Sequence, residues 1–328
     1  MNKPGMGHNE LHNPHNQIPL ILGILSIWAL CGTSLEAQSS KAAQADSVQW
    51  KTVAEGFAFP EGPAWDPVQN RLCVSNCYSD WVALIQDGRV DTLVQQSDAP
   101  QILEKTNGLA VGPDGWVYGC EFGKGSIIRI SAQGDVEVYA SGFQNKSFNR
   151  PNDLAFDSGG NVYFTDPKSY DPDKPDGAVY RIDKETRQVK QVATELAFPN
   201  GIAFSPDGQF VYLCASAKQR VLRYRLINNG SLGDREVFAE LPGGDPDGIA
   251  FDRKSRLYVA HFGGSAVYVL DKNGQIQRKI STPGAKPSNV EFGGQDYRTL
   301  YITEDETNAV YSTRVTTPGL RLFSSPQK

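Results

Sequence analysis

The sequence predicts an all-β fold, a six-bladed β-propeller of four-stranded blades. One phrase recurs six times, as FPEGPAWD, KTNGLAVG, RPNDLAFD, FPNGIAFS, DPDGIAFD and KPSNVEFG. In each copy an acidic or amide residue, usually followed by glycine, precedes a short apolar run. The six key residues are Glu61, Asn107, Asn152, Asn200, Asp247 and Asn289. They lie 42 to 48 residues apart, and a period in the forties made of short strands is typical of a propeller blade.

Each repeat contains four short β-type runs in the order that a blade requires. In the third repeat these runs are 154–156, 162–165, 178–182 and 189–193. The first two are separated by Asp-Ser-Gly-Gly at 157–160, which has the turn chemistry of a hairpin. The sequence has no apolar stripe at helical spacing longer than two turns, which argues against an α/β barrel of similar length.

One end of the repeat region lacks a strand, and the other end has an extra one. The sixth repeat ends after its third strand, near 311–315, and residues 48–53 resemble a fourth strand without a blade. Pairing the two segments would close the ring and remove two open sheet edges. We therefore predict that an N-terminal strand closes the propeller and that residues 38–328 form one catalytic domain.

The N-terminus indicates export. Residues 18–30 (IPLILGILSIWAL) form an apolar run too short to span a bilayer comfortably, and small residues follow it up to Ala37. We interpret residues 1–37 as a signal peptide cleaved near Ala37, which places the protein in the periplasm or outside the cell. An uncleaved membrane anchor is the alternative.

Composition narrows the possible partners. The formal net charge is −5, which provides no basic surface for nucleic acid or for an anionic membrane. We expect a monomer that acts on a small molecule and is not inserted in a membrane after the signal is removed. Four cysteines follow the signal, and they are either paired in a disulfide or buried as thiols.

The key residues predict a cation site. The innermost strand of every blade begins near the axis, so the six side chains should converge at one mouth of the central channel. All six carry oxygen, and Ca²⁺ takes six to eight oxygen ligands, including carboxylates and amides. Glu61 and Asp247 would balance one divalent charge. The alternatives are that these residues serve only in turns, where Asn and Asp are common, or that the ion is purely structural.

A second ring follows from aligning the second strands. The aligned positions are Asn76, Glu121, Asp166, Ala215, His261 and Glu304. We expect them to surround the same mouth, further from the axis. His261 is the only histidine after the signal, and its position in the ring predicts a role as proton shuttle or substrate contact.

Four phrases carry a family resemblance: FAFPEGPAWDP, NRPNDLAFDSGGNVYFTDP, FPNGIAFSPDG and DPDGIAFD. They resemble the regucalcin/gluconolactonase family of six-bladed propellers, and KTNGLAVGPDGWVYGCE resembles its bacterial gluconolactonase branch. The metal ligands that this resemblance implies are Glu61, Asn200 and Asp247, and Asn152 matches a position that contacts the metal or the substrate; we include Asn152 in the predicted ligand set. The resemblance also implies that Arg150 contacts the substrate. The animal relatives place an acidic substrate contact twenty residues beyond that arginine, where this chain has Tyr170, so the sugar lactone that fits stays open.

The expected activity is hydrolysis of a small sugar lactone with one divalent cation, Ca²⁺ before Mg²⁺, Mn²⁺ or Zn²⁺. The cation would stabilise the oxyanion, and Asp247 would activate water, with His261 or Asp166 as the alternative proton acceptor. Residues expected to hold substrate are Arg150, Asn107, Asn152 and Glu121. No G-x-S-x-G motif is present, which disfavours a serine nucleophile. A phosphotriesterase with the same metal site and a non-catalytic binding propeller are the alternatives.

Overall fold

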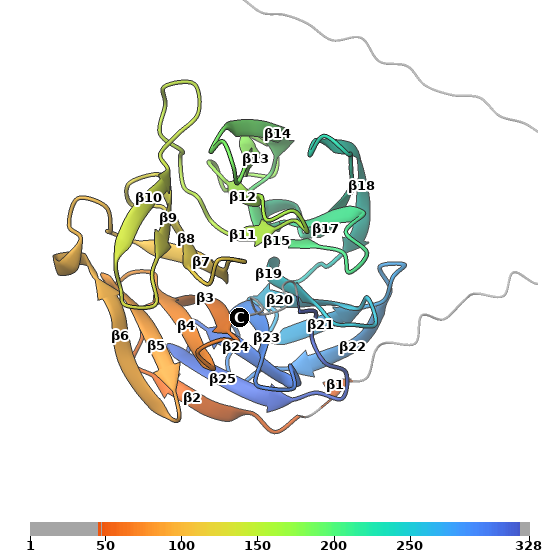
Figure 1. Cartoon of the computed structure of the whole chain (residues 1–328). Helices are drawn as coiled ribbons and strands as arrows, with labels where there is room; N and C mark the ends of the chain where they lie inside the picture. Colours follow the sequence, from red (N-terminus) through yellow and green to blue (C-terminus); the bar gives the residue numbers. More distant parts are fainter. Residues whose placement is uncertain (1–44, 47, 322–328) are drawn as a thin grey trace, which may run out of the picture. The chain divides into compact units, whose positions relative to one another are not determined.

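The computed structural model describes residues 45–46 and 48–321. In this part of the chain the strands form six sheets around a common axis, as Figure 1 shows, and the described residues belong to one compact unit. The predicted all-β, six-bladed propeller is therefore confirmed. The predicted signal peptide, residues 1–37, lies outside the described residues.

In the first three blades, four consecutive strands pair in chain order, and the first strand lies nearest the axis. Blade A contains β3 (Pro60–Asp66), β4 (Arg71–Asn76), β5 (Trp81–Gln86) and β6 (Arg89–Gln95). Blade B contains β7 (Thr106–Val111), β8 (Val117–Glu121), β9 (Ser126–Ile130) and β10 (Val136–Ala140). Blade C contains β11 (Leu154–Phe156), β12 (Val162–Asp166), β13 (Gly177–Ile182) and β14 (Val189–Leu196).

The other three blades complete the ring. Blade D contains β15 (Pro199–Phe204), β16 (Phe210–Ala215), β17 (Arg220–Leu226) and β18 (Leu232–Glu240). Blade E contains β19 (Asp245–Phe251), β20 (Leu257–Phe262), β21 (Ala266–Leu270) and β22 (Ile276–Ser281), with β1 (Ala45–Asp46) at its outer edge. Blade F contains β23 (Pro287–Gly293), β24 (Thr299–Glu304), β25 (Ala309–Arg314) and β2 (Lys51–Glu55).

An N-terminal strand closes the ring, as predicted. Strand β2 pairs antiparallel with β25, and Thr52 lies opposite Tyr311. The strand begins three residues later than the predicted 48–53. Strand β1 was not predicted: it pairs parallel to β22, with Ala45 opposite Lys279, and gives blade E a fifth strand. Two residues outside the repeat are too short for a periodicity to indicate a strand.

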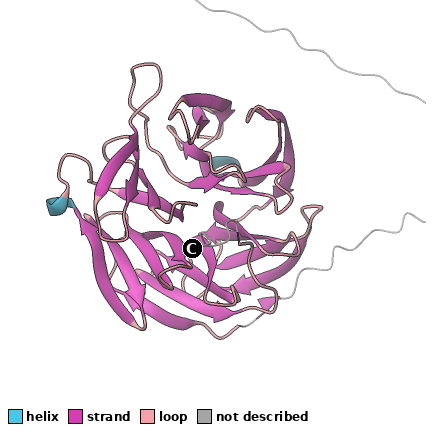
Figure 2. Ribbon diagram, viewed as in Figure 1, coloured by secondary structure: helices cyan, strands magenta, loops and turns pink. Residues whose placement is uncertain are grey.

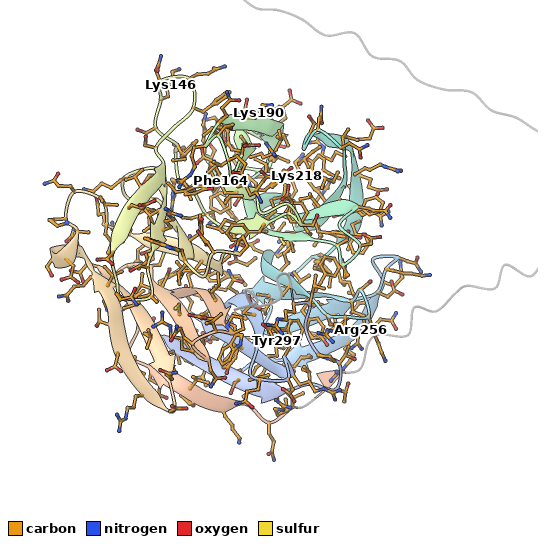
Figure 3. All side chains as sticks on the ribbon, viewed as in Figure 1. Lys146, Phe164, Lys190, Lys218, Arg256 and Tyr297 are labelled. Atoms are coloured by element: carbon orange, nitrogen blue, oxygen red, sulfur yellow. The ribbon has the colours of Figure 1, made fainter. Side chains whose placement is uncertain are left out.

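The hydrophobic core lies between the blades. Six clusters of buried apolar side chains each join two neighbouring blades. Between blades C and D, for example, the rings of Tyr163 and Phe204 meet edge to face with centroids 5.0 Å apart. Figure 3 shows Phe164 inside blade C and Lys190 on its outer strand. Because each face packs against the next blade, hydrophobic burial fixes the blades around the axis.

Helical structure is minimal in the described residues. It consists of two 3₁₀ turns, η1 (Gln96–Asp98) and η2 (Ser216–Lys218), as Figure 2 shows. Among the described residues, no helix has the length and hydrophobicity needed to cross a membrane. The four cysteines that follow the predicted signal are buried and free, so the thiol alternative holds over the disulfide.

Candidate active site

The structure brings five of the six key residues to one cavity. They are Glu61, Asn107, Asn152, Asn200 and Asp247. The cavity has a volume of about 180 Å³ and lies at one mouth of the central channel. Each residue lies in the innermost strand of its blade or just before it. Positions about 45 residues apart in the sequence are thus placed around one point, as the repeat predicts.

Irregular pairing at the start of the innermost strands directs these side chains inward. The pairing of β3 with β4 shifts register just after Glu61. Strands β15 and β19 show the same shift around Asn200 and Asp247. A bulge of this kind bends the strand and re-aims a side chain, and bulges are frequent beside active sites. Regular strand pairing is therefore interrupted at the residues whose side-chain oxygens face the axis.

The glycine that follows most key residues allows neighbouring blades to meet. A Cβ atom on Gly62 would lie 2.5 Å from the carbonyl oxygen of Asn107 in the next blade. A Cβ atom on Gly108 would lie 2.7 Å from the carbonyl oxygen of Asn152. The Gly108 N–H donates to that same oxygen at 2.7 Å. Glycine is required here for close backbone approach, which explains why it recurs in the repeated phrase.

Two buried carboxylates give the cavity its electrostatic character. Glu61 accepts hydrogen bonds from the Gly62 N–H at 2.7 Å and from Nδ2 of Asn289 at 3.0 Å. Burial nevertheless raises the pKa of Glu61 to about 7. Burial, and then the charge of Glu61, raises the pKa of Asp247 well above its usual range. The Oδ1 atom of Asp247 is buried and has no hydrogen-bond partner among the described residues.

These observations fit a divalent cation. An unpartnered buried carboxylate oxygen is costly, and a cation beside it removes that cost and the repulsion from Glu61. In the described part of the chain, the amide groups of Asn152 and Asn200 form no hydrogen bond, so their oxygens are free to coordinate. No cluster of three or more His, Cys, Asp or Glu side chains suited to a metal occurs among the described residues. An oxygen set with only two carboxylates favours a hard cation.

The sixth key residue is placed differently. Asn289 does not line this cavity, and its side chain belongs to the opposite half of the channel. Its Nδ2 donates to Glu61, while its Oδ1 accepts the N–H of Val290 at 2.8 Å. Asn289 therefore holds a carboxylate in position instead of offering its own oxygen to the axis.

Side chains of the second ring form hydrogen bonds with the loops that lead to the six key residues. Asp166 accepts the Arg150 N–H at 2.6 Å, and Glu304 accepts the Lys286 N–H at 2.7 Å. Asn76 accepts the N–H of Ala58. In each case a side chain at the end of a second strand fixes the segment that leads into the first strand of its own blade.

Glu121 and His261 lie outside the cavity, contrary to the contacts expected of them. Glu121 accepts the N–H groups of Glu104 and Lys105 with one oxygen and that of Lys124 with the other. His261 is fully buried, its Nε2 lies 2.8 Å from the carbonyl oxygen of Leu241, and burial lowers its pKa. Both carboxylate oxygens of Glu121 are occupied and solvent does not reach His261, so direct substrate contact does not agree with this placement.

The second strands meet the cavity one residue beyond the aligned positions. Successive side chains point to opposite faces of a strand, and the cavity is lined by the residue after the aligned position. In blades A, B, D and E these are Cys77, Phe122, Ser216 and Phe262. In four blades the residue two before the key residue also lines the cavity. These positions are Phe59, Arg150, Phe198 and Asp245.

Aromatic side chains surround the entrance. Besides the residues just named, Tyr78 and Tyr170 line the cavity, and each is 57% exposed. The guanidinium carbon of Arg150 lies 5.7 Å from the ring centroid of Phe122. Sequence reasoning identified Arg150 and singled out position 170, but missed the other aromatic residues, whose only sequence signal is an offset of one or two residues from the aligned positions.

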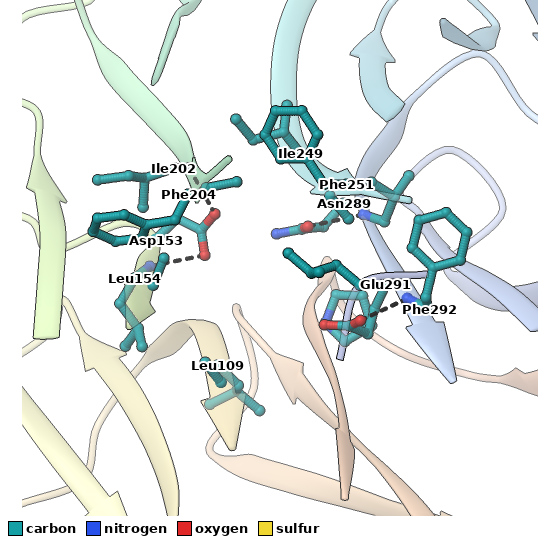
Figure 4. A pocket seen from close by; sticks show the side chains of 17 residues that line it. Leu109, Asp153, Leu154, Ile202, Phe204, Ile249, Phe251, Asn289, Glu291 and Phe292 are labelled. Atoms are coloured by element: carbon teal, nitrogen blue, oxygen red, sulfur yellow. Dashed lines mark hydrogen bonds between the residues drawn. The ribbon is translucent and has the colours of Figure 1, made fainter. Parts of the chain in front are cut away.

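The opposite half of the channel is a second cavity of about 100 Å³, drawn in Figure 4 and lined by later residues of the same innermost strands. Asp153 and Glu291 extend from opposite walls (Figure 4) and accept the N–H groups of Leu154 and Phe292. Burial raises the pKa of Asp153 to about 7 and that of Glu291 to about 8. The rest of the lining is mainly apolar, so the set suited to a cation lies at the first mouth.

Fold and site together define a six-bladed propeller with an oxygen-lined axial pocket. The family model described as "SMP-30/Gluconolactonase/LRE-like region" matches residues 59–305 of this chain. The chain belongs to this family, which confirms the resemblance seen in the repeated phrases.

Individual relatives agree with the family match. A gluconolactonase of Zymomonas mobilis is 30% identical over 284 residues, which are 77% of this chain and 78% of that protein. A solved structure of a gluconolactonase from Xanthomonas campestris is 31% identical with a TM-score of 0.73, and the match covers 83% of this chain and 90% of that one. A 6-deoxy-6-sulfogluconolactonase of Pseudomonas putida is 36% identical over 163 residues, 45% of this chain. That last match spans only 56% of the relative's length.

Proposed function

We propose that the protein is a cation-dependent hydrolase that opens a small sugar lactone of the gluconolactone type. The observation that carries the proposal is the axial pocket, where two buried carboxylates and three amides converge and one carboxylate oxygen has no partner among the residues that the structure describes. The relatives named gluconolactonase support the choice of substrate. Hydrolysis of a lactone in general is supported both by the axial pocket and by these relatives.

The cation would be held by Glu61, Asn152, Asn200 and Asp247. When bound, it supplies positive charge for the lactone carbonyl oxygen as that oxygen becomes an oxyanion. Ca²⁺ suits the all-oxygen set best, and Mg²⁺, Mn²⁺ and Zn²⁺ are the alternatives to be tested.

The chain's own residues would handle the water and the substrate. A carboxylate oxygen of Asp247 that does not hold the cation would accept the proton of a water molecule as the water oxygen bonds to the carbonyl carbon. The ring C–O bond then breaks, and the ring oxygen takes this proton from Asp247, which gives the open hydroxy acid. Arg150 and Asn107 line the same cavity and would hold the hydroxyl groups. His261 and Glu121 would act only by fixing the loops around the site.

A panel of lactones tests the proposal. Protein stripped with EDTA is assayed on glucono-1,5-lactone against the spontaneous rate, with Ca²⁺, Mg²⁺, Mn²⁺ or Zn²⁺ added back singly. We expect turnover to return with one or more ions and to be absent in Asp247→Asn, while Asp91→Asn, at an exposed position on β6, keeps it. Full activity in Asp247→Asn, or no ion-dependent turnover of any lactone, would refute the assignment.

The same experiment separates the alternatives. Ion-dependent hydrolysis of a phosphotriester in place of lactones would favour a phosphotriesterase. The charged groups Arg150 and Asp245 in the pocket argue for a hydroxyl-rich ligand instead. Binding of a lactone without turnover would favour a non-catalytic propeller.

We further propose that the protein is exported after cleavage near Ala37 and acts as a monomer in the periplasm or outside the cell. N-terminal sequencing of protein from fractionated cells tests the cleavage, and light scattering tests the oligomeric state. An intact N-terminus in the membrane fraction would show an uncleaved anchor instead.

A further inference from the structure

Two charged residues in the pocket are not needed to hold the cation, and they have opposite signs. Arg150 and Asp245 both line the cavity. Within the described residues, no carboxylate lies within ion-pair distance of the Arg150 guanidinium. The hydroxyl of Ser216, another polar lining group, is already used, because it donates to the carbonyl oxygen of Pro246 at 2.7 Å. Arg150 can only donate hydrogen bonds, and Asp245, when ionised, can only accept them.

Tyr170 ties Asp245 to a distant loop. It lies between β12 and β13 of blade C, and its ring meets that of Phe198, just before β15 of blade D, with centroids 5.0 Å apart. Its hydroxyl donates to Oδ2 of Asp245, the first residue of β19 in blade E, at 2.5 Å. One side chain therefore links three blades across the edge of the pocket.

The loop that carries Tyr170 is itself braced. The N–H and the hydroxyl of Ser169 both donate to the carboxylate of Asp176, each at 2.9 Å. This closes the loop at its base, so the tyrosine is presented from a fixed support.

The contact leaves Asp245 with capacity to bind. An ionised carboxylate has about four acceptor sites, and within the described residues only Tyr170 donates to this side chain. Tyr170 is 57% exposed, so the pair is open to molecules that enter the cavity. Exposed polar contacts of this kind contribute little to the free energy of unfolding, and a purely structural role does not explain why the pair lies at the pocket.

We propose that Asp245, oriented by Tyr170, is the pocket's acceptor for a substrate hydroxyl and determines its preference for hydroxylated lactones. Asp245 is a binding residue, and Tyr170 is a positioning residue that acts through it. Arg150 supplies the complementary donor. This inference rests on the proposed lactonase function.

Two lactones with the same six-membered ring test the inference. Glucono-1,5-lactone carries hydroxyl groups, and δ-valerolactone carries none. Tyr170→Phe keeps the edge-to-face contact with Phe198. For this variant we expect KM for the gluconolactone to rise roughly fivefold, while kcat and KM for δ-valerolactone stay within about twofold. Asp245→Asn removes the charge and keeps nearly the same shape. It should lower the ratio of kcat/KM for glucono-1,5-lactone to kcat/KM for δ-valerolactone about tenfold.

A matched control removes a tyrosine hydroxyl elsewhere in the same blade. Tyr180 accepts a hydrogen bond from Gln191 and does not line the pocket, so Tyr180→Phe should leave the ratio unchanged. Equal losses on both lactones in Tyr170→Phe, or no change in either, would overturn the inference and leave the lactonase proposal standing. A wild-type protein that opens no lactone with any of the added ions would overturn both.

Discussion

Replacing Asp247 with asparagine should have opposite effects on the metal-free and the metal-bound protein. In the metal-free protein, Asp247 and Glu61 are both buried, and burial, followed by the charge of Glu61, raises the pKa of Asp247. Asparagine keeps the shape and removes one charge. We therefore expect Asp247→Asn to be more stable than the wild type without metal and to gain nothing from added Ca²⁺.

The size of the effect follows from burial. Each pH unit by which burial raises the pKa of a carboxyl group costs about 1.4 kcal/mol of folding free energy once the group is ionised. Burial, and then the charge of Glu61, raises the pKa of Asp247 well above its usual range, so the stability that this group contributes is present below about pH 4 and is lost as the pH rises through the raised pKa. Asparagine removes this cost, whereas the cost of ionising Glu61, whose pKa rises to about 7, stays in both proteins. We expect the variant to be at least about 1 kcal/mol more stable at pH 8 and nearly equal at pH 4.

Thermal unfolding measures both effects. For a chain of this size 1 kcal/mol shifts Tm by about 2 °C, so Asp247→Asn without metal should unfold at least about 2 °C higher at pH 8. Ca²⁺ at 100 times its Kd should stabilise the wild type by about 2.7 kcal/mol, or roughly 5 °C, and should not change the Tm of the variant. A lower Tm in the metal-free variant, or a Ca²⁺ shift as large as in the wild type, would refute the reasoning. Asp91→Asn serves as the control for loss of a charge.

Three further predictions concern groups around the site. Asn289→Leu removes the 3.0 Å bond to Glu61 and should weaken Ca²⁺ binding about tenfold by calorimetric titration; unchanged affinity would contradict the role of Asn289. Glu304→Gln loses charge-assisted bonds from the N–H groups of Lys286 and Thr307 and should cost about 2 kcal/mol in urea unfolding, with kcat within about twofold. In the metal-free protein, Glu291→Gln removes a partly exposed carboxyl whose pKa burial raises to about 8, so wild-type stability is lost between about pH 4.5 and 8. That variant should be about 1–2 kcal/mol more stable at pH 9 and equal at pH 4, and parallel pH profiles would argue against it.

Much of the fold followed from repetition. Each phrase marks the same point in a blade, so six phrases predicted six blades, and the unpaired segment near residue 50 predicted the closing strand. Strand β1 was not predicted, because two residues that pair at the outer edge of a sheet give no periodic pattern in the sequence.

The site was predicted in part, and the errors have a common physical cause. Five of the six key residues line one cavity, because the repeat places them at equivalent points around the axis. The second ring was aligned correctly along the chain, but its side chains brace loops, and the following residues face the cavity. Glu121 and Phe122 illustrate this: the pleat sends neighbours to opposite faces, and composition alone does not reveal which face meets the axis.

The amino-acid sequence alone determined the number of blades, the closure of the ring and the oxygen-rich character of the axis, because these properties repeat every 42 to 48 residues. Only the tertiary structure decided that Asn289 supports Glu61, that His261 is enclosed, and that Tyr170 reaches Asp245. Contacts between blades and along loops depend on side-chain direction and on distances between segments 75 or 228 residues apart, and no repeat in the sequence encodes them.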